Sequence, residues 1–190
     1  MKSILYALCL TISLCLPSLA KGPVRTIDGI VTKVFDGDTL NVMDSRGRTV
    51  KVHLYGVDAP ETEKLNRTGG RTNRSGQPYG DESGKVLAAK IYQKRVKVEV
   101  MDVDHNSRSI SVVWLDGRNI NREMVAEGYV WAYREYLDQS HSAEYIQAEE
   151  QARSRKLGLW QQIDPVPPWE FRKQFKKRII LKALSFKWFE

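Results

Sequence analysis

Two short acidic clusters contain the residues best suited to chemistry. The first is Asp36-Gly37-Asp38-Thr39, and the second is Gly56-Val57-Asp58-Ala59-Pro60-Glu61-Thr62. Each follows a run of residues that favours a β-strand. Neighbouring antiparallel strands could bring both clusters to one rim of a barrel, where carboxylates and backbone carbonyls would face one another. Such hard oxygen ligands suit Ca²⁺. A single Asp-Gly pair is usually only a turn, whereas two clusters at this spacing favour a site.

The elements that must position these clusters can be predicted from the residue pattern. Strands are predicted at 24–34, 39–43, 49–55, 96–100 and 109–115. Helices are predicted at 81–93, from a cap at Asn121 to a stop at Gly128, and at 140–156. The glycine-rich stretch 63–80 is predicted to be an exposed, mobile loop. This order predicts a mainly β fold with α, a five-stranded OB-fold barrel with three flanking helices.

The sequence resembles the staphylococcal nuclease (thermonuclease) family over roughly residues 24–160. The resemblance lies in the two acidic clusters and in the segments 78–80, 104–108, 121–128 and 149–160. It implies an OB-fold enzyme that hydrolyses the phosphodiester bonds of DNA and RNA with Ca²⁺.

The resemblance also implies roles for single residues. Asp38 and Asp58 take the positions of the calcium-ligand carboxylates, and the carbonyl of Ala59 takes the place of a threonine carbonyl. Glu61 takes the position of the general base that orients the attacking water. Arg108 takes the second arginine position, which holds the phosphate and stabilises charge near the leaving 5′ oxygen. Phosphoryl transfer needs a positioned water, charge neutralisation and help for the leaving group, so the chemistry agrees with these roles.

His53 departs from the family pattern, which usually has an arginine five residues before the aspartate at Asp58. Arginine is always charged and binds phosphate in a fork, whereas histidine titrates near neutral pH. Three interpretations follow. His53 is a weaker phosphate ligand, or a general acid or base that lessens the metal requirement, or a sign of an impaired site. The stretch before Arg108 also lacks the Tyr-Gly that often precedes this arginine, so Arg108 could instead be an ordinary turn residue.

Aromatic and basic residues alternate directly after the second predicted helix, which stops at Gly128. Tyr129, Trp131, Tyr133 and Tyr136 surround Arg134, a mix that suits base stacking beside phosphate contacts. Tyr129 and Arg134 are therefore candidate nucleic-acid-binding residues. Packing of some of these aromatic side chains in the core is the alternative.

The first twenty residues are predicted to be a secretory signal. Met1-Lys2 is followed by a mostly apolar run at 4–16, then by Pro17 and the small residues that precede a cut after Ala20. The protein is therefore expected to be exported, to the periplasm or the medium. The mature chain would have 170 residues (190 − 20) and no cysteine, because Cys9 and Cys15 would be removed. That would exclude disulfides, thiolate zinc sites and cysteine nucleophiles.

The chain is basic, with 30 Lys and Arg against 23 Asp and Glu, and a pI near 9.4. Such a balance favours polyanionic partners. Residues 161–190 carry seven basic and three acidic side chains, a net +4, behind a proline-containing linker. Phe171, Phe175 and Ile179 have helical spacing in this basic aromatic tail. The tail could be an amphipathic helix on nucleic acid or weakly on an anionic membrane, or a solvated extension.

The sequence thus predicts a signal peptide at 1–20, a nuclease-like OB-fold domain at 21–160 and a tail at 161–190. The predicted function is that of an exported, sugar-non-specific nuclease, Ca²⁺-assisted, with DNA and RNA as partners. It is expected to act as a monomer without an obligate protein partner. The alternatives are a non-catalytic OB-fold module that binds nucleic acid, and a membrane-associated protein that uses its tail.

Overall fold

The structure is a computed structural model, and it describes residues 22–65 and 72–186. The predicted signal peptide at 1–20 lies outside the described residues, as does the middle of the predicted loop at 63–80.

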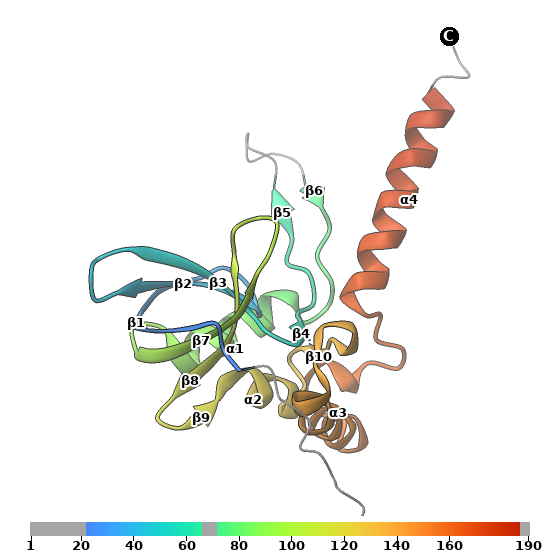
Figure 1. Ribbon diagram of the computed structural model, residues 1–190. Coiled ribbons are helices and arrows are strands. Elements are labelled where there is room, and N and C mark those ends of the chain that lie inside the picture. Colours follow the sequence, from blue (N-terminus) through green and yellow to red (C-terminus); the bar gives the residue numbers. More distant parts are fainter. Residues whose placement is uncertain (1–21, 66–71, 187–190) are drawn as a thin grey trace, which may run out of the picture.

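Five long strands form the closed barrel that dominates Figure 1. They are β1 (Arg25–Val34), β2 (Thr39–Asp44), β3 (Thr49–Leu54), β7 (Arg95–Val103) and β8 (Ser109–Leu115). Their order is β3-β2-β1-β7-β8, with antiparallel neighbours, and the short β9 (Arg118–Asn119) extends the edge of β8. A parallel pairing of β3 with β8 closes the barrel. The predicted OB-fold barrel is confirmed.

Alternation along the strands supplies the interior of the barrel. In β2, Leu40 and Val42 are fully buried, and in β3 the same is true of Val52. Because successive strand residues point to opposite faces, these side chains share the inner face. Val98 and Val113 complete the core from β7 and β8. The core therefore holds rigid the two strand ends that carry the acidic clusters.

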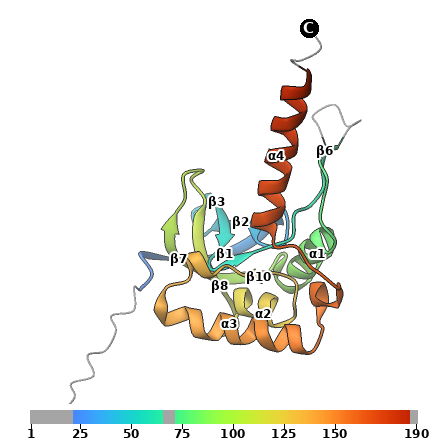
Figure 2. The same ribbon diagram turned by 90° about the vertical axis from the view of Figure 1, so that its right-hand side faces the viewer.

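Three helices pack on the barrel, as predicted. They are α1 (Gly80–Ile91), α2 (Ile120–Ala126) and α3 (Gln139–Ser154). Figure 2 shows α2 and α3 together beneath the barrel and α1 to one side. The prediction that Asn121 caps α2 was wrong. Asn119 is the cap and accepts from the backbone N–H of Arg122, whereas Asn121 is fully buried within the helix.

Short elements connect these parts. β4 (Val57–Asp58) pairs with β10 (Trp131–Ala132), which is followed by the 3₁₀ turn η1 (Arg134–Tyr136). β5 (Lys64–Leu65) pairs with β6 (Thr72–Arg74), so the described ends of the predicted loop form a short hairpin. The turn η2 (Gly158–Gln161) ends the predicted domain.

The tail forms a helix, α4 (Pro168–Phe186). Both ribbon views show α4 leaving the domain as a separate rod after its first turns (Figures 1 and 2). Its start is anchored, because Trp169 packs with Trp131 and Trp160. Among the described residues, no helix combines the length and the apolar character needed to cross a membrane.

Candidate active site

One cavity gathers the six residues that the sequence assigned to catalysis or to metal binding. The cavity has a volume of about 580 Å³. Its lining includes Asp38, His53, Asp58, Ala59, Glu61 and Arg108. The barrel therefore brings the two acidic clusters to one rim, together with an arginine from the turn between β7 and β8.

Asp38 joins the two clusters directly. Its backbone carbonyl accepts a hydrogen bond from the N–H of Leu54 at 2.8 Å, which ties the first cluster to the end of β3. Its side-chain Oδ2 accepts from the N–H of Ala59, also at 2.8 Å. The turn before it needs glycine, because a Cβ on Gly37 would overlap the side chains of Ser83 and Ala59.

His53 lies beside Asp38 because Thr39 and His53 face each other across β2 and β3. The Nδ1 atom of His53 is 3.1 Å from Oδ1 of Asp38 and 3.2 Å from Oγ1 of Thr39. Burial opposes a charge on His53, but the carboxylate of Asp38 prevails and raises the pKa of His53. His53 is therefore held by Asp38 rather than pointing freely at a substrate.

The buried carboxyls of the first cluster have opposite properties. Burial and the neighbouring Asp38 raise the pKa of Asp36 to about 7. Burial also opposes ionisation of Asp38. The charge of His53, its hydrogen bond and the N–H of Ala59 nevertheless hold the pKa of Asp38 well below its usual range. Because one negative charge disfavours a second one nearby, Asp38 is the carboxyl of the pair that ionises first.

Arg108, which also lines the cavity, is oriented by Asp104. Its Nε donates to Oδ2 of Asp104 at 2.7 Å, and its backbone N–H donates to Oδ1 of the same residue at 2.8 Å. Nη1 of Arg108 reaches to 3.5 Å from Nδ1 of His53. The turn arginine is thus fixed with its guanidinium at the cavity, as its predicted role requires.

Asp58 and Glu61 share a partner that the sequence did not indicate. Nη1 and Nη2 of Arg172, from α4, donate to the two oxygens of Asp58 at 3.0 and 2.7 Å. Nη1 also donates to Oε1 of Glu61 at 3.0 Å. Burial raises the pKa of Asp58 although Arg172 acts in the opposite direction. Arg172, which follows Asp58 by 114 positions in the chain, therefore binds both the predicted metal ligand and the predicted base.

Gln77 fixes the backbone around Glu61. Its side-chain Oε1 accepts from the N–H of Glu61 at 3.1 Å, and its own N–H donates to the carbonyl of Glu61 at 2.7 Å. A side chain on Gly80 would collide with the same carbonyl, so glycine is needed there. The side-chain Nε2 of Gln77 donates to the carbonyl of Val166 at 2.8 Å. One glutamine thus links the predicted base to the linker before α4.

The arrangement does not fit the Ca²⁺ that the resemblance implies. Both oxygens of Asp58 accept from Arg172. The oxygens of Asp38 face Thr39, His53 and Ala59. Within 22–65 and 72–186, no group of three or more His, Cys, Asp or Glu side chains is arranged to hold a metal ion. A cation on Asp58 would require Arg172 to move away.

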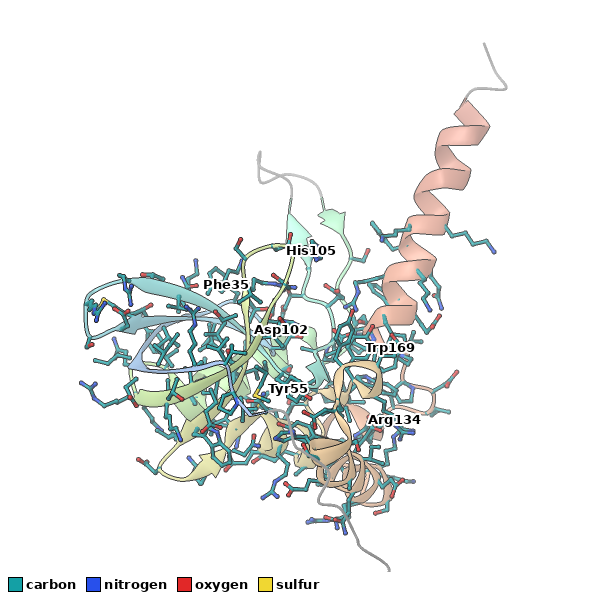
Figure 3. All side chains as sticks on the ribbon, viewed as in Figure 1. Phe35, Tyr55, Asp102, His105, Arg134 and Trp169 are labelled. Carbon is teal, nitrogen blue, oxygen red and sulfur yellow. The ribbon has the colours of Figure 1, made fainter. Side chains whose placement is uncertain are left out.

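The two predicted nucleic-acid-binding residues do not line this cavity. Tyr129 packs partly buried against the core, and Nη2 of Arg134 lies 3.4 Å from Oε2 of Glu149. Figure 3 shows Arg134 well away from the β7–β8 turn that carries His105. The tyrosines that line the cavity are instead Tyr55, Tyr133 and Tyr136.

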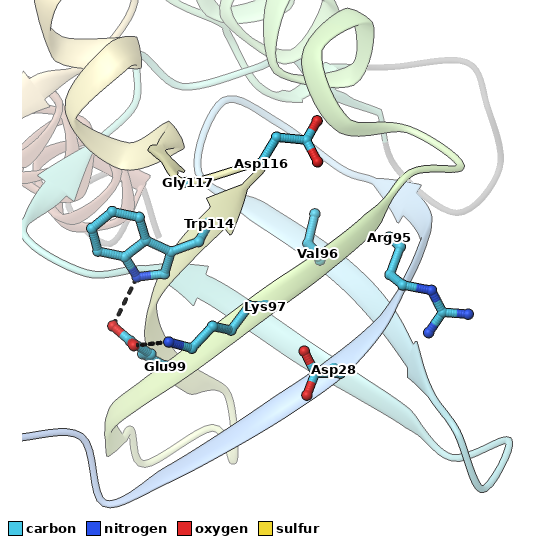
Figure 4. Close-up of a pocket in the computed structure, with 8 residues that line it drawn as sticks. All are labelled: Asp28, Arg95, Val96, Lys97, Glu99, Trp114, Asp116 and Gly117. Carbon is cyan, nitrogen blue, oxygen red and sulfur yellow. Dashed lines mark hydrogen bonds and ion pairs between the residues drawn. The ribbon is translucent and has the colours of Figure 1, made fainter.

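A second depression lies on the outside of β1, β7 and β8, with a volume of about 390 Å³. Figure 4 shows that one of its carboxylates, that of Glu99, is already paired. Glu99 accepts from Nε1 of Trp114 at 2.8 Å and binds Nζ of Lys97 at 2.7 Å. Its lining contains none of the acidic-cluster residues. The first cavity is therefore the candidate active site.

Comparison with known proteins agrees with this assignment. Residues 51–162 match the family described as "Staphylococcal nuclease homologue". The chain is 36% identical over 156 residues to an uncharacterized endonuclease of Haemophilus influenzae, covering 82% of this chain and 79% of the relative. It is 33% identical over 157 residues to a micrococcal nuclease of Shigella flexneri, covering 78% and 82%. Protein ParB of Escherichia coli is 30% identical over 159 residues, covering 79% and 81%.

Proposed function

The chain belongs to the staphylococcal nuclease family, and we propose that it is an exported nuclease that hydrolyses phosphodiester bonds in both DNA and RNA. Family membership and the names of its relatives support nuclease activity at the level of the family. The observation that carries the finer proposal is the shared cavity. Its wall holds a glutamate fixed through its backbone, Glu61, and an arginine fixed by a carboxylate, Arg108.

The proposed chemistry is an in-line attack of water on phosphorus. Glu61 accepts the proton of the attacking water as the new P–O bond forms. The bond from phosphorus to the 5′ oxygen breaks, and the guanidinium of Arg108 stabilises the charge that develops there. His53, held by Asp38, contributes a further cationic donor toward the phosphate. The leaving oxygen takes its proton from solvent.

Ca²⁺ stays outside the proposed steps, because Arg172 occupies both oxygens of Asp58. Members of the family are generally calcium-dependent, and Ca²⁺ bound at such a site would neutralise phosphate charge. Asp38, Asp58 and the carbonyl of Ala59 remain the ligands that the family pattern implies.

The central test is Glu61→Gln, with Glu63→Gln as the matched control, because Glu63 is an exposed glutamate two positions along the chain. Wild type and variants are assayed on single-stranded DNA, double-stranded DNA and RNA, with Ca²⁺ and with chelator. Loss of a general base typically lowers the rate by about 10²–10⁴-fold. We expect that loss for Glu61→Gln with substrate binding retained, and wild-type rates for Glu63→Gln.

Two outcomes would contradict the proposal in different ways. Wild-type turnover by Glu61→Gln would remove Glu61 from the reaction. A wild-type protein that binds all three nucleic acids without cleaving any would instead be a binding module on the same fold.

Export is proposed from the first twenty residues. Expression of the full chain in a bacterial host should yield mature protein outside the cytoplasm, and N-terminal sequencing should begin at Lys21. Full-length protein retained in the cytoplasm would contradict a cleavable signal. The net positive tail supports an additional contact with nucleic acid, or a weaker one with an anionic membrane. Flotation with anionic vesicles separates these two.

A further inference from the structure

The guanidinium of Arg172 lies inside the nuclease cavity although the residue comes from the C-terminal helix. We infer that Arg172 is a phosphate-binding residue of the active site, delivered by α4 in place of the arginine that the family carries where this chain has His53. This inference rests on the proposed nuclease function. It assigns to the tail a part in the reaction in addition to any electrostatic contact with nucleic acid.

The hydrogen bonds of Arg172 leave one edge of its guanidinium available. Nη1 uses both of its hydrogens, one on Asp58 and one on Glu61, and Nη2 uses one on Asp58. The Nε–H and the second Nη2 hydrogen remain, and they lie side by side on the same edge of the group. Two parallel N–H donors of this kind match two oxygens of a phosphate. Arg172 can therefore hold its carboxylates and a phosphate at the same time.

The position of Arg172 is built into the fold. Three residues earlier, Trp169 stacks on Tyr133 with ring centres 5.0 Å apart and planes 6° apart. The same indole meets Trp131 edge-on at 5.7 Å. Figure 3 shows Trp169 at the foot of α4, where the helix meets the domain. Together with the bond from Gln77 to Val166, these contacts fix the start of α4 beside the cavity.

The charges of the cavity explain why a third cation is needed. Its wall carries six carboxyl groups, from Asp36, Asp38, Asp58, Glu61, Asp102 and Asp104. Arg108 is bound to Asp104 and His53 to Asp38, so each already offsets a carboxylate of its own. Without Arg172, a phosphate entering the cavity would meet the carboxylate of Asp58 with no guanidinium bound to it. Like charges a few ångströms apart repel strongly at a partly buried site.

The guanidinium forms part of the wall and does not fill the cavity. The side chain of Arg172 is 34% exposed, and a volume of about 580 Å³ remains with it in place. A residue that only blocked the site would be expected to fill that volume. We therefore favour participation over autoinhibition, and the experiment below distinguishes them.

The test compares Arg172→Ala with Lys173→Ala in the full-length mature protein. Lys173 is the matched control, because it is an exposed cation on the next position of α4 and its ion pair is with Glu170. Steady-state cleavage of a defined oligonucleotide is measured with Ca²⁺ and with chelator. Removing one preorganised donor from a charged transition state costs about 10²–10³-fold in kcat. We expect a loss of at least about 100-fold for Arg172→Ala and none for Lys173→Ala.

A second pair of variants separates a role in the reaction from a role in folding. Arg172→Lys keeps the charge but lacks the fork, so it should retain less than about one tenth of the wild-type activity. His53→Arg in the Arg172→Ala background places a guanidinium at the family position. The double variant should be at least about tenfold more active than Arg172→Ala alone. Thermal unfolding is recorded for each protein. If Arg172→Ala unfolds early, Arg172→Lys and the double variant still decide.

Two results would overturn the inference. Equal or higher activity of Arg172→Ala in Ca²⁺ would show that Arg172 shields the site instead of serving it. A loss that His53→Arg does not recover at all would show that Arg172 does not supply the missing guanidinium. Neither result would affect the assignment of Glu61, whereas a wild-type protein without nuclease activity would end the proposed function itself.

Discussion

Replacing Asn121 with aspartate should destabilise the protein strongly, although both residues are equally good helix caps. In the structure Asn121 is fully buried. Its Oδ1 accepts from the N–H of Val113, and its Nδ2 donates to the carbonyls of Tyr55 and Ser111, each at 3.0 Å. Aspartate keeps the acceptor and loses both amide N–H donors, for which its neutral form offers a single O–H. The carbonyl of Ser111 still accepts a hydrogen bond from the N–H of Tyr55 at 2.7 Å. The carbonyl of Tyr55 is therefore the one that suffers most from the loss of the amide donor.

The magnitude follows from burial. A carboxyl that must be neutral in the folded state costs about 1.4 kcal/mol for each pH unit above its unfolded pKa of about 3.9. At pH 7 this amounts to roughly 4 kcal/mol, and at pH 5 to roughly 1.5 kcal/mol. Burial raises the pKa of the introduced aspartate in the folded state. The loss of stability is therefore present above the unfolded pKa and declines as the pH falls towards that value. We expect Asn121→Asp to lose about 3–5 kcal/mol of unfolding free energy at pH 7.

Urea denaturation at pH 7 and pH 5 measures this loss, with Asn119→Asp as the control. Asn119 is the observed cap of α2, and aspartate caps equally well, so the control should change stability by less than about 0.5 kcal/mol. The argument would be refuted if Asn121→Asp lost less than about 1 kcal/mol at pH 7, or if its loss did not shrink at pH 5.

Three further predictions concern the cap of α3, the competition of Arg172 with Ca²⁺ for Asp58, and the tail. Asp138→Ala should lower the unfolding free energy by about 1 kcal/mol at pH 7, because it removes the acceptor that caps α3. Burial opposes ionisation of Asp138, but hydrogen bonds from the first turn of α3 hold its pKa below its usual range. The stabilisation by Asp138 is therefore complete above about pH 4 and is lost as the pH falls further. Urea denaturation at pH 7 and at pH 2 measures this difference. Arg172→Gln should tighten Ca²⁺ binding at least about tenfold, because it frees the oxygens of Asp58. Calorimetric titration measures the affinity. An unchanged affinity would show that Arg172 and Ca²⁺ do not compete for Asp58. A protein truncated after Trp160 should still unfold cooperatively, since the barrel and its three flanking helices end there. Its binding to nucleic acid should become weaker and less salt-dependent. A broad, non-cooperative thermal transition would show that the tail is part of the fold.

The local pattern of the sequence was enough to predict the barrel. Each of its five strands combines alternating or β-branched residues with a turn signal such as Asp44-Ser45-Arg46-Gly47, and those signals act between residues close together in the chain. The acidic clusters could be located in the same way, because each directly follows a strand whose end is fixed by the core. Their meeting at one rim then followed from the antiparallel pairing of neighbouring strands.

The cap of α2 shows where local pattern is insufficient. Asn119 and Asn121 are equally suitable caps by residue type, and both precede the apolar residues of the helix. The choice depends on the barrel, because Asn121 is the one whose amide reaches the backbone of Tyr55 and Val113. Tyr129 and Arg134 illustrate the same limit. Their residue types suit nucleic acid, but only the tertiary structure places them outside the cavity, Tyr129 against the core and Arg134 beside Glu149.

Arg172 could only be found in the tertiary structure. In the sequence it is one of seven basic residues in a tail, and nothing in its neighbourhood distinguishes it from Lys173. Its place in the cavity is set by Trp169 on Tyr133 and by Gln77 on Val166, contacts between segments far apart in the chain. Sequence pattern reports on forces between near neighbours, namely alternation, turns and caps. The partner of a buried carboxylate is chosen by which cation the completed fold brings within hydrogen-bonding distance, and that depends on all the packing between them.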